Sequence, residues 1–135
     1  MIKKDIFRII DANFNRSREG LRVCEEVARF SWNSPSLTKE LKKIRHDITG
    51  IISGQRALAK ILCSSRDTIC DVGRLPRCAS EMSRRGASDI FSANIERVKE
   101  SIRVLEEFFK LIDKKNSARF TRLRFKVYEI EKKAL

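Results

Sequence analysis

The sequence contains one amphipathic segment twice. Residues 9–30 and residues 90–111 align with an offset of 81 positions, and nine of the 22 aligned residues are identical. Most of the identical residues are polar or charged, so the two copies share a spaced pattern of Asn, Arg and Glu. A duplication retained only for packing would keep its apolar positions and let its surface charges drift. The retained charges therefore indicate a site built from both copies.

Apolar residues recur at helical spacing in both copies, which predicts two long amphipathic helices. The first is expected to begin with Asp5 as its N-cap and to end near Phe30, and a second helix is expected to begin after Ser34. The last part of the chain repeats the apolar stripe of that second helix with an offset of 79 positions, which aligns Arg45 with Arg124. The repeated unit is therefore a helical hairpin, and two hairpins predict an all-α fold with a four-helix core.

One domain is expected for a chain of 135 residues. The repeat units are residues 5–53 and 89–135, and residues 54–88 connect them. In this connecting segment, residues 56–63 predict a short fifth helix. The remainder is a long loop with several arginines and glycines, and loops of this length are usually functional. We expect it to cover one end of the bundle.

The composition favours an anionic partner. The chain has 30 Lys and Arg against 18 Asp and Glu, a net charge of +12. Its apolar runs are too short to span a membrane, and its first residues lack the apolar core of a signal peptide. The four cysteines form no C-x-x-C pair and the chain has one histidine, so a zinc site is not expected. Reduced thiols in a cytoplasmic protein are the simpler interpretation.

Four duplicated polar residues are the first candidate site. Asn13 and Arg16 fall inside the apolar arc of the first helix, and Asn94 and Arg97 fall at the same places in the second copy. A buried guanidinium is costly unless it is paired. The arginines could form structural ion pairs with the glutamates three residues further on. Alternatively, all four residues converge on one cleft, where the arginines bind an anion in a bidentate manner.

Four further arginines are candidate phosphate ligands. Arg22 and Arg103 each precede two glutamates by three and four residues, which is also the spacing of ion pairs on a solvated helix face. Arg45 and Arg124 occupy equivalent positions in the second helix of each hairpin. Both interpretations, phosphate binding and structural pairing, remain open for these residues.

The connecting segment contains the second candidate site, the motif R-D-T-x-x-D-V-G at residues 66–73. Asp67 and Asp71 could hold Mg²⁺ against a phosphate that Arg66 contacts, because Mg²⁺ takes one or two protein carboxylates plus substrate oxygens. The alternative is turn formation, with the carboxylates capping backbone N–H groups. The sequence has neither a P-loop nor a G-x-G-x-x-G motif, so phosphate binding must come from side chains and helix N-termini.

Several segments of the chain together resemble a known family, a small helical domain of bacterial thiamine biosynthesis. In chain order they are DANFNRSREGLRVCEEVARF, LKKIRHDI, SRDTICDVG, SANIERVKESIRVLEEFFK and FTRLRFKVYEIE. The family's domain occurs alone or as an N-terminal extension of thiamine-phosphate synthase, and it is described as an alternative hydroxymethylpyrimidine-phosphate kinase. The resemblance implies transfer of the ATP γ-phosphate to 4-amino-2-methyl-5-hydroxymethylpyrimidine phosphate, with ATP and Mg²⁺ as cofactors. The synthase reaction itself is not expected, because its β/α barrel needs about 250 residues.

Two other classes of function compete with a kinase. A nucleic-acid-binding domain is disfavoured because the arginines alternate with glutamates and aromatic residues for base stacking are few. A non-catalytic adaptor that docks on a thiamine-phosphate synthase is the other alternative. The sequence does not determine whether a homodimer completes the site, which half of the cleft binds ATP, or whether the unphosphorylated pyrimidine is also a substrate.

Overall fold

The computed structural model describes residues 3–74 and 79–135, and within them the regular structure is entirely helical. The elements are α1 (Lys4–Glu26), η1 (Val27–Ser31), α2 (Pro35–Ser53), α3 (Arg56–Ser65), α4 (Ala79–Met82), α5 (Ala87–Phe109) and α6 (Lys114–Ala134). Here η1 is a π-helical extension of α1, and α3 is the fifth helix that the sequence predicts. The all-α fold with a four-helix core is confirmed, and the connecting segment contains one additional short helix, α4.

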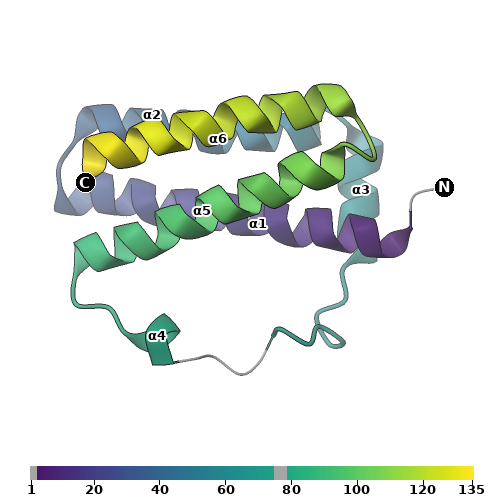
Figure 1. The fold of residues 1–135 in the computed structure, drawn as a ribbon, viewed down its shortest axis with the longest axis horizontal. Helices are drawn as coiled ribbons and strands as arrows, with labels where there is room; N and C mark the ends of the chain where they lie inside the picture. The colour runs from purple at the N-terminus through teal and green to yellow at the C-terminus, as the bar shows by residue number, and fades with distance from the viewer. Residues whose placement is uncertain (1–2, 75–78) are drawn as a thin grey trace.

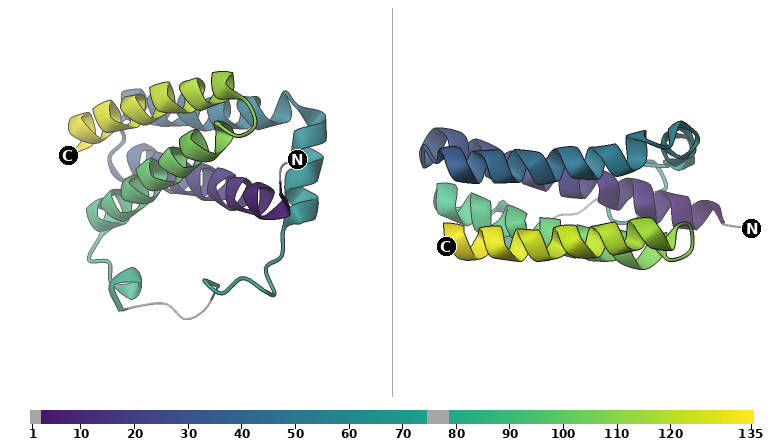
Figure 2. Two further views of the ribbon diagram at one scale, coloured as in Figure 1. Left: turned by 45° about the vertical axis from the view of Figure 1, so that its right-hand side comes forward. Right: turned by 90° about the horizontal axis from the view of Figure 1, so that it is seen from above.

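The four long helices form two layers. Helices α1 and α5 cross in direct contact, and α2 and α6 lie together on one side of them (Figure 1). Within the connecting segment, α3 packs against α1 and α2. Residues 66–74 and 79–86, which include α4, lie on the opposite side of α1 and α5, as the left view of Figure 2 also shows. The polar faces of the two duplicated helices are therefore turned toward the connecting segment, and their apolar faces toward α2 and α6.

The helix boundaries follow from local chemistry. Ser34 caps α2 by accepting a hydrogen bond from the N–H of Leu37, and Pro35 occupies the first helical position. The expectation that Asp5 caps α1 is wrong. Lys3 is the last residue with extended backbone, so Asp5 lies inside the first turn, where its charge complements the helix dipole.

One cluster of buried apolar residues joins α1, α2, α3, α5 and α6. Its largest members are Phe91, Phe109 and Phe120, which are fully buried. The ring of Phe109 packs on that of Phe120 with centroids 5.1 Å apart, and Trp32 packs on Phe91 at 4.8 Å. The Phe109–Phe120 contact lies within the second hairpin, whereas Trp32–Phe91 joins the first hairpin to α5, so the two hairpins share one core.

Each hairpin is closed by the same ion pair. Arg45 of α2 binds Glu25 of α1 through Nε at 2.9 Å and Nη2 at 3.3 Å. Arg124 of α6 binds Glu106 of α5 in the same bidentate manner, at 2.8 Å and 3.3 Å. The two glutamates are 81 positions apart and the two arginines 79, which are the offsets of the sequence repeat. The duplication therefore preserves a specific contact between helices as well as the helices themselves.

The Glu106–Arg124 pair makes stability depend on pH. Burial is the largest single influence and by itself would raise the pKa of Glu106. The hydrogen bonds from Arg124 and Thr121 and the positive charges of Arg124 and Arg103 together outweigh burial and lower the pKa below the usual glutamate value. The folded-state pKa is thus below the unfolded-state value of about 4.3. The stabilisation is present above the unfolded value and is lost as the pH falls through the folded one.

We expect Glu106→Gln to lower the free energy of unfolding at pH 7 by about 2 kcal/mol, because it leaves a half-buried guanidinium without its carboxylate. The difference from the unmodified chain should shrink as the pH falls through the lowered folded-state pKa of Glu106, because the carboxylate then becomes protonated. Urea denaturation at pH 7 and at a series of acidic pH values measures both quantities. The control is Glu107→Gln at an exposed neighbour, which should change stability by less than about 0.5 kcal/mol. If Glu106→Gln lowered the free energy of unfolding equally at every pH, the stabilisation would not come from the ion pair with Arg124.

The crossing of α1 and α5 requires a glycine. A Cβ at Gly20 would lie 2.8 Å from Cγ2 of Val98 and 3.2 Å from the carbonyl oxygen of Asn94. The equivalent position of α5 is Ser101, which is buried but tolerates a side chain. The closest approach of the two duplicated helices therefore depends on the missing side chain of one of them.

Gly20→Ala should lower the free energy of unfolding by about 1–3 kcal/mol, since the added methyl group forces the two helices apart at a backbone contact. Gly50→Ala is the matched control, because a Cβ at this exposed position of α2 meets no atom within 4 Å. The control should raise stability by about 0.5–1 kcal/mol through helix propensity. Urea denaturation of the two variants measures both changes in the free energy of unfolding. Equal changes of the same sign in Gly20→Ala and Gly50→Ala would contradict the close contact at Gly20.

Candidate functional site

A groove with two hollows lies between the polar faces of α1 and α5 and the connecting segment. The α1–loop hollow is lined by Asp5, Arg8, Ile9, Asp11, Ala12, Asn13, Asn15, Arg16, Glu19, Arg66, Asp67, Thr68 and Asp71. The α1–α5 hollow is lined by Asn13, Arg16, Gly73, Arg74, Glu81, Arg84, Ala93, Asn94, Arg97, Glu100, Ser101 and Val104. Their volumes, about 530 and 650 Å³, lie in the range of small-molecule sites.

The four duplicated polar residues meet in the α1–α5 hollow. Asn13 and Arg16 reach it from α1, and Asn94 and Arg97 reach it from α5. The two asparagines are held alike, because the Nδ2 of each donates at 2.8 Å to the carbonyl oxygen four residues earlier. Neither Oδ1 accepts a hydrogen bond from residues 3–74 or 79–135. Each asparagine therefore offers an acceptor of fixed orientation at the groove.

Arg16 and Arg97 are exposed, so the expectation that they lie inside a buried apolar arc is wrong. Both arginines line the open α1–α5 hollow and not the enclosed contact between the two helices. In the described part of the chain, neither arginine forms an ion pair, so pairing with Glu19 or Glu100 is not observed. Their charges remain available to an anion in the groove.

The connecting segment is anchored to α1 by Asp11. Its carboxylate accepts two hydrogen bonds from Arg66, at 2.7 Å from Nε and 2.9 Å from Nη2. This contact raises the pKa of Arg66 above its usual value. Arg8 adds a second contact by donating to the carbonyl oxygen of Asp67 at 3.4 Å. The guanidinium of Arg66 thus holds the start of the motif against the groove.

Asp11 is a functional candidate that the sequence analysis missed. It lies beside Ile10 in the first copy and is 4% exposed, whereas the second copy has Ser92 at the equivalent position. A carboxylate that appears in one copy of a duplicated helix, at a buried position, is the signal that could have identified it. Its partner is 55 residues away, so the pattern alone could not identify Arg66 as that partner.

Asp67 and Asp71 both form turns within the motif. Oδ1 of Asp67 accepts from the N–H of Cys70 at 3.1 Å, and Oδ1 of Asp71 accepts from the N–H of Gly73 at 2.9 Å. The backbone hydrogen bond from Cys70 holds the pKa of Asp67 below its usual value, so this carboxylate is ionised at neutral pH. The turn interpretation is therefore observed, and each turn uses one oxygen of its carboxylate.

Each of these carboxylates keeps one oxygen outside its turn that could bind a magnesium ion. Among the described residues, no group of three or more His, Cys, Asp or Glu side chains is arranged to hold a metal ion. Mg²⁺ does not need such a group, because one or two carboxylates and phosphate oxygens are its usual ligands in phosphoryl-transfer sites. Asp67 and Asp71 line the same hollow, so both could contribute an oxygen to one ion.

The remaining predicted arginines are engaged by carboxylates. Arg45 and Arg124 form the ion pairs that close the hairpins. Arg22 pairs with Glu26 at 3.1 Å, and Arg103 pairs with Glu106 at 3.0 Å. Of the two interpretations left open for Arg22 and Arg103, the structure shows the i,i+3 and i,i+4 ion pairs. None of the four arginines lines either hollow of the groove, so phosphate binding there rests on other arginines.

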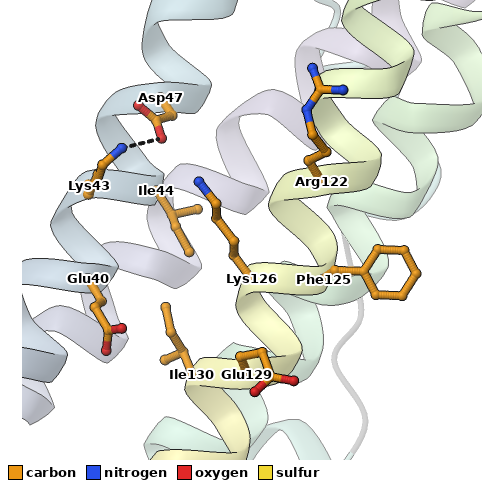
Figure 3. A pocket seen from close by; sticks show the side chains of 9 residues that line it. All are labelled: Glu40, Lys43, Ile44, Asp47, Arg122, Phe125, Lys126, Glu129 and Ile130. Atoms are coloured by element: carbon orange, nitrogen blue, oxygen red, sulfur yellow. Dashed lines mark hydrogen bonds and ion pairs between the residues drawn. The ribbon is translucent and has the colours of Figure 1, made fainter.

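A separate hollow of about 400 Å³ lies between α2 and α6, on the far side of the bundle. Figure 3 shows Ile44 and Ile130 between the two helices and Phe125 pointing away from them. Charged side chains surround this apolar floor, including Lys43, which pairs with Asp47 at 3.5 Å. None of the candidate site residues from the sequence lines this hollow.

We expect Asp11→Asn to release the connecting segment from α1. Loss of the charge-assisted contact to Arg66 should lower the free energy of unfolding by about 1.5–3 kcal/mol. Hydrogen exchange measured by mass spectrometry should accelerate for residues 66–74. The control is Asp5→Asn, because Asp5 lines the same hollow and forms no ion pair in the described part of the chain. Unchanged exchange in the Asp11→Asn protein would show that this contact does not position the segment.

Fold and groove together define a class of small helical proteins made of two hairpins. An arginine-containing groove lies between the first helix of each hairpin and the segment that connects the hairpins. The model of the ThiD2 family matches residues 8–133, so the chain belongs to the ThiD2 family.

The curated relatives are longer proteins. The chain is 41% identical over 125 residues to the thiamine-phosphate synthase of Rhodopirellula baltica, covering 93% of this chain and 33% of that protein. It is 40% identical over 126 residues to the thiamine-phosphate synthase of Synechocystis, covering 93% and 35%. The chain thus spans about a third of the relatives it matches, and its context is thiamine biosynthesis. No solved structure matches the chain.

No helix in the described ranges has the length and apolarity that crossing a membrane requires.

Proposed function

We propose that this chain transfers the γ-phosphate of ATP to hydroxymethylpyrimidine phosphate, giving the diphosphate and ADP. The observation that carries the proposal is the convergence of Arg16 and Arg97 in one hollow, where neither has a carboxylate partner among the described residues. Phosphoryl transfer depends mainly on positioning and on stabilisation of negative charge. Unpaired guanidinium groups beside a loop with two carboxylates supply these two requirements.

The reaction requires no general base from the protein. The attacking atom is an oxygen of the substrate's phosphate monoester, whose second pKa is about 6, so it is largely dianionic at neutral pH. This oxygen forms a bond to the γ-phosphorus as the bond from that phosphorus to the β,γ-bridging oxygen breaks. ADP leaves with the electron pair. The absence of histidine from the lining of the groove is compatible with this chemistry.

Residues of this chain would orient the reactants. Arg16 and Arg97 would bind phosphate oxygens, and Asn13 and Asn94 would accept hydrogen bonds from donors such as the 4-amino group of the pyrimidine. Asp67 and Asp71 would hold Mg²⁺, which when bound neutralises charge on the β- and γ-phosphates. Asp11 would act as a positioning residue, because it holds Arg66 and the start of the motif on α1.

Asp67→Asn should reduce kcat by about 10²–10³, because it removes a charge while the amide oxygen can still accept from Cys70. The melting temperature should stay within about one degree of the unmodified chain, since the turn is preserved. The assay measures ADP and pyrimidine diphosphate with purified protein, ATP, Mg²⁺ and the pyrimidine phosphate. The control is Asp47→Asn on α2, outside the groove, which should leave kcat unchanged. Retained activity with a large loss of stability would assign Asp67 to turn formation alone.

The fused relatives favour a second candidate function, a non-catalytic adaptor that docks on a thiamine-phosphate synthase. The supporting observation is that this chain matches about a third of proteins with that name. Thermal-shift measurements separate the two candidates, because a ligand that binds the folded state raises the melting temperature. A rise with ATP–Mg²⁺ and with the pyrimidine phosphate supports the kinase. A rise only with a separately produced synthase supports the adaptor.

A further inference from the structure

Charge is divided unequally between the two hollows of the groove. The α1–α5 hollow has four arginines and two glutamates among its lining residues. The α1–loop hollow has three arginines and five carboxylates. One arginine of the α1–loop hollow, Arg66, is already bound by Asp11, so carboxylates dominate what remains. The two hollows therefore differ in the sign of their excess charge.

Asn13 and Arg16 line both hollows and so mark the boundary between them. The connecting segment crosses the same boundary, because Asp71 lines the α1–loop hollow whereas Gly73 and Arg74 line the α1–α5 hollow. A group bound at this boundary is within reach of ligands in both hollows. Arg16 is the cationic side chain that the two hollows share.

We propose that the two substrates occupy separate hollows and that Arg16 contacts the phosphoryl group that passes between them. The metal-bound triphosphate of the nucleotide takes the α1–loop hollow, and the phosphate monoester of the pyrimidine takes the α1–α5 hollow. This assignment rests on the proposed kinase function and specifies which part of the site serves which substrate.

Electrostatics determines which substrate is assigned to which hollow. A bare triphosphate is repelled by an excess of carboxylates, so it can bind beside Asp67 and Asp71 only together with a divalent cation. A phosphate monoester dianion binds without metal where arginines are in excess, because guanidinium groups match its oxygens in a bidentate manner. With this placement the γ-phosphoryl group and the attacking oxygen meet at the boundary that Arg16 lines, where the attacking oxygen can approach from the side opposite the leaving oxygen.

The test measures the binding of each substrate separately, by calorimetry with the full chain. The probes are a non-hydrolysable ATP analogue, with and without Mg²⁺, and hydroxymethylpyrimidine phosphate. The variants are Arg97→Gln for the α1–α5 hollow and Asp71→Asn for the α1–loop hollow. Both change exposed side chains, and Asn at position 71 can still accept from Gly73. The matched control is Arg122→Gln on α6, which lines the separate hollow of Figure 3.

Arg97→Gln should raise the Kd of the pyrimidine phosphate by about 10-fold to 100-fold and change that of the Mg²⁺-bound analogue by less than about twofold. Asp71→Asn should raise the Kd of the Mg²⁺-bound analogue by about 10-fold and leave the pyrimidine phosphate unaffected. Without Mg²⁺, Asp71→Asn should bind the analogue more tightly than the unmodified chain, because a repelling charge is gone. Arg16→Gln should lower kcat by about 10²–10³, and Arg122→Gln should match the unmodified chain throughout.

The opposite pattern, in which Arg97→Gln weakens the nucleotide and Asp71→Asn weakens the pyrimidine phosphate, would overturn the assignment while the kinase function stands. Equal weakening of both substrates by each variant would also overturn it, because the groove would then be one undivided site. If the unmodified chain binds neither substrate, the proposed function itself fails. The two failures are therefore distinguishable in the same set of titrations.

Discussion

The close contact of α1 with α5 at Gly20 is the constraint on which the rest of the structure depends. Because no side chain separates the helices there, the backbone of α5 comes within 3.2 Å of where a Cβ would lie. This approach brings the polar faces of both duplicated helices to the same side of the molecule. The apolar faces remain for α2 and α6. A wider separation would move Asn13 and Arg16 away from Asn94 and Arg97, and the α1–α5 hollow would lose one of its walls.

The duplicated arginines have two distinct roles, which depend on burial. Arg45 and Arg124 are half-buried between helices, where a guanidinium requires a carboxylate partner, and each forms a bidentate pair. Arg16 and Arg97 lie at the edge of the contact between α1 and α5, where water solvates their charges, so no partner is required. Exposure is what leaves these two arginines free to bind an anion. One type of residue thus stabilises the bundle in one layer and lines the groove in the other.

The two copies of the hairpin have diverged where the connecting segment meets them. Asp11 of the first copy binds Arg66, and the second copy has Ser92 at the equivalent position. The motif is therefore held against α1, and its two carboxylates lie in the hollow on that side. A symmetric bundle has in this way acquired a groove with two different ends. The proposed transfer between two unlike substrates would use this difference.

The sequence by itself determined the helices, their pairing into two hairpins and the apolar stripes that form the core, because helical periodicity and capping are local properties. It also identified Asn13, Arg16, Asn94 and Arg97 as a group, since a repeat places equivalent residues in equivalent positions. Only the tertiary structure decided which arginines are exposed and that Asp11 holds Arg66. Burial depends on where two helices cross, and the partners of that ion pair are 55 residues apart. No local pattern encodes a contact whose geometry is set by the packing of the whole bundle.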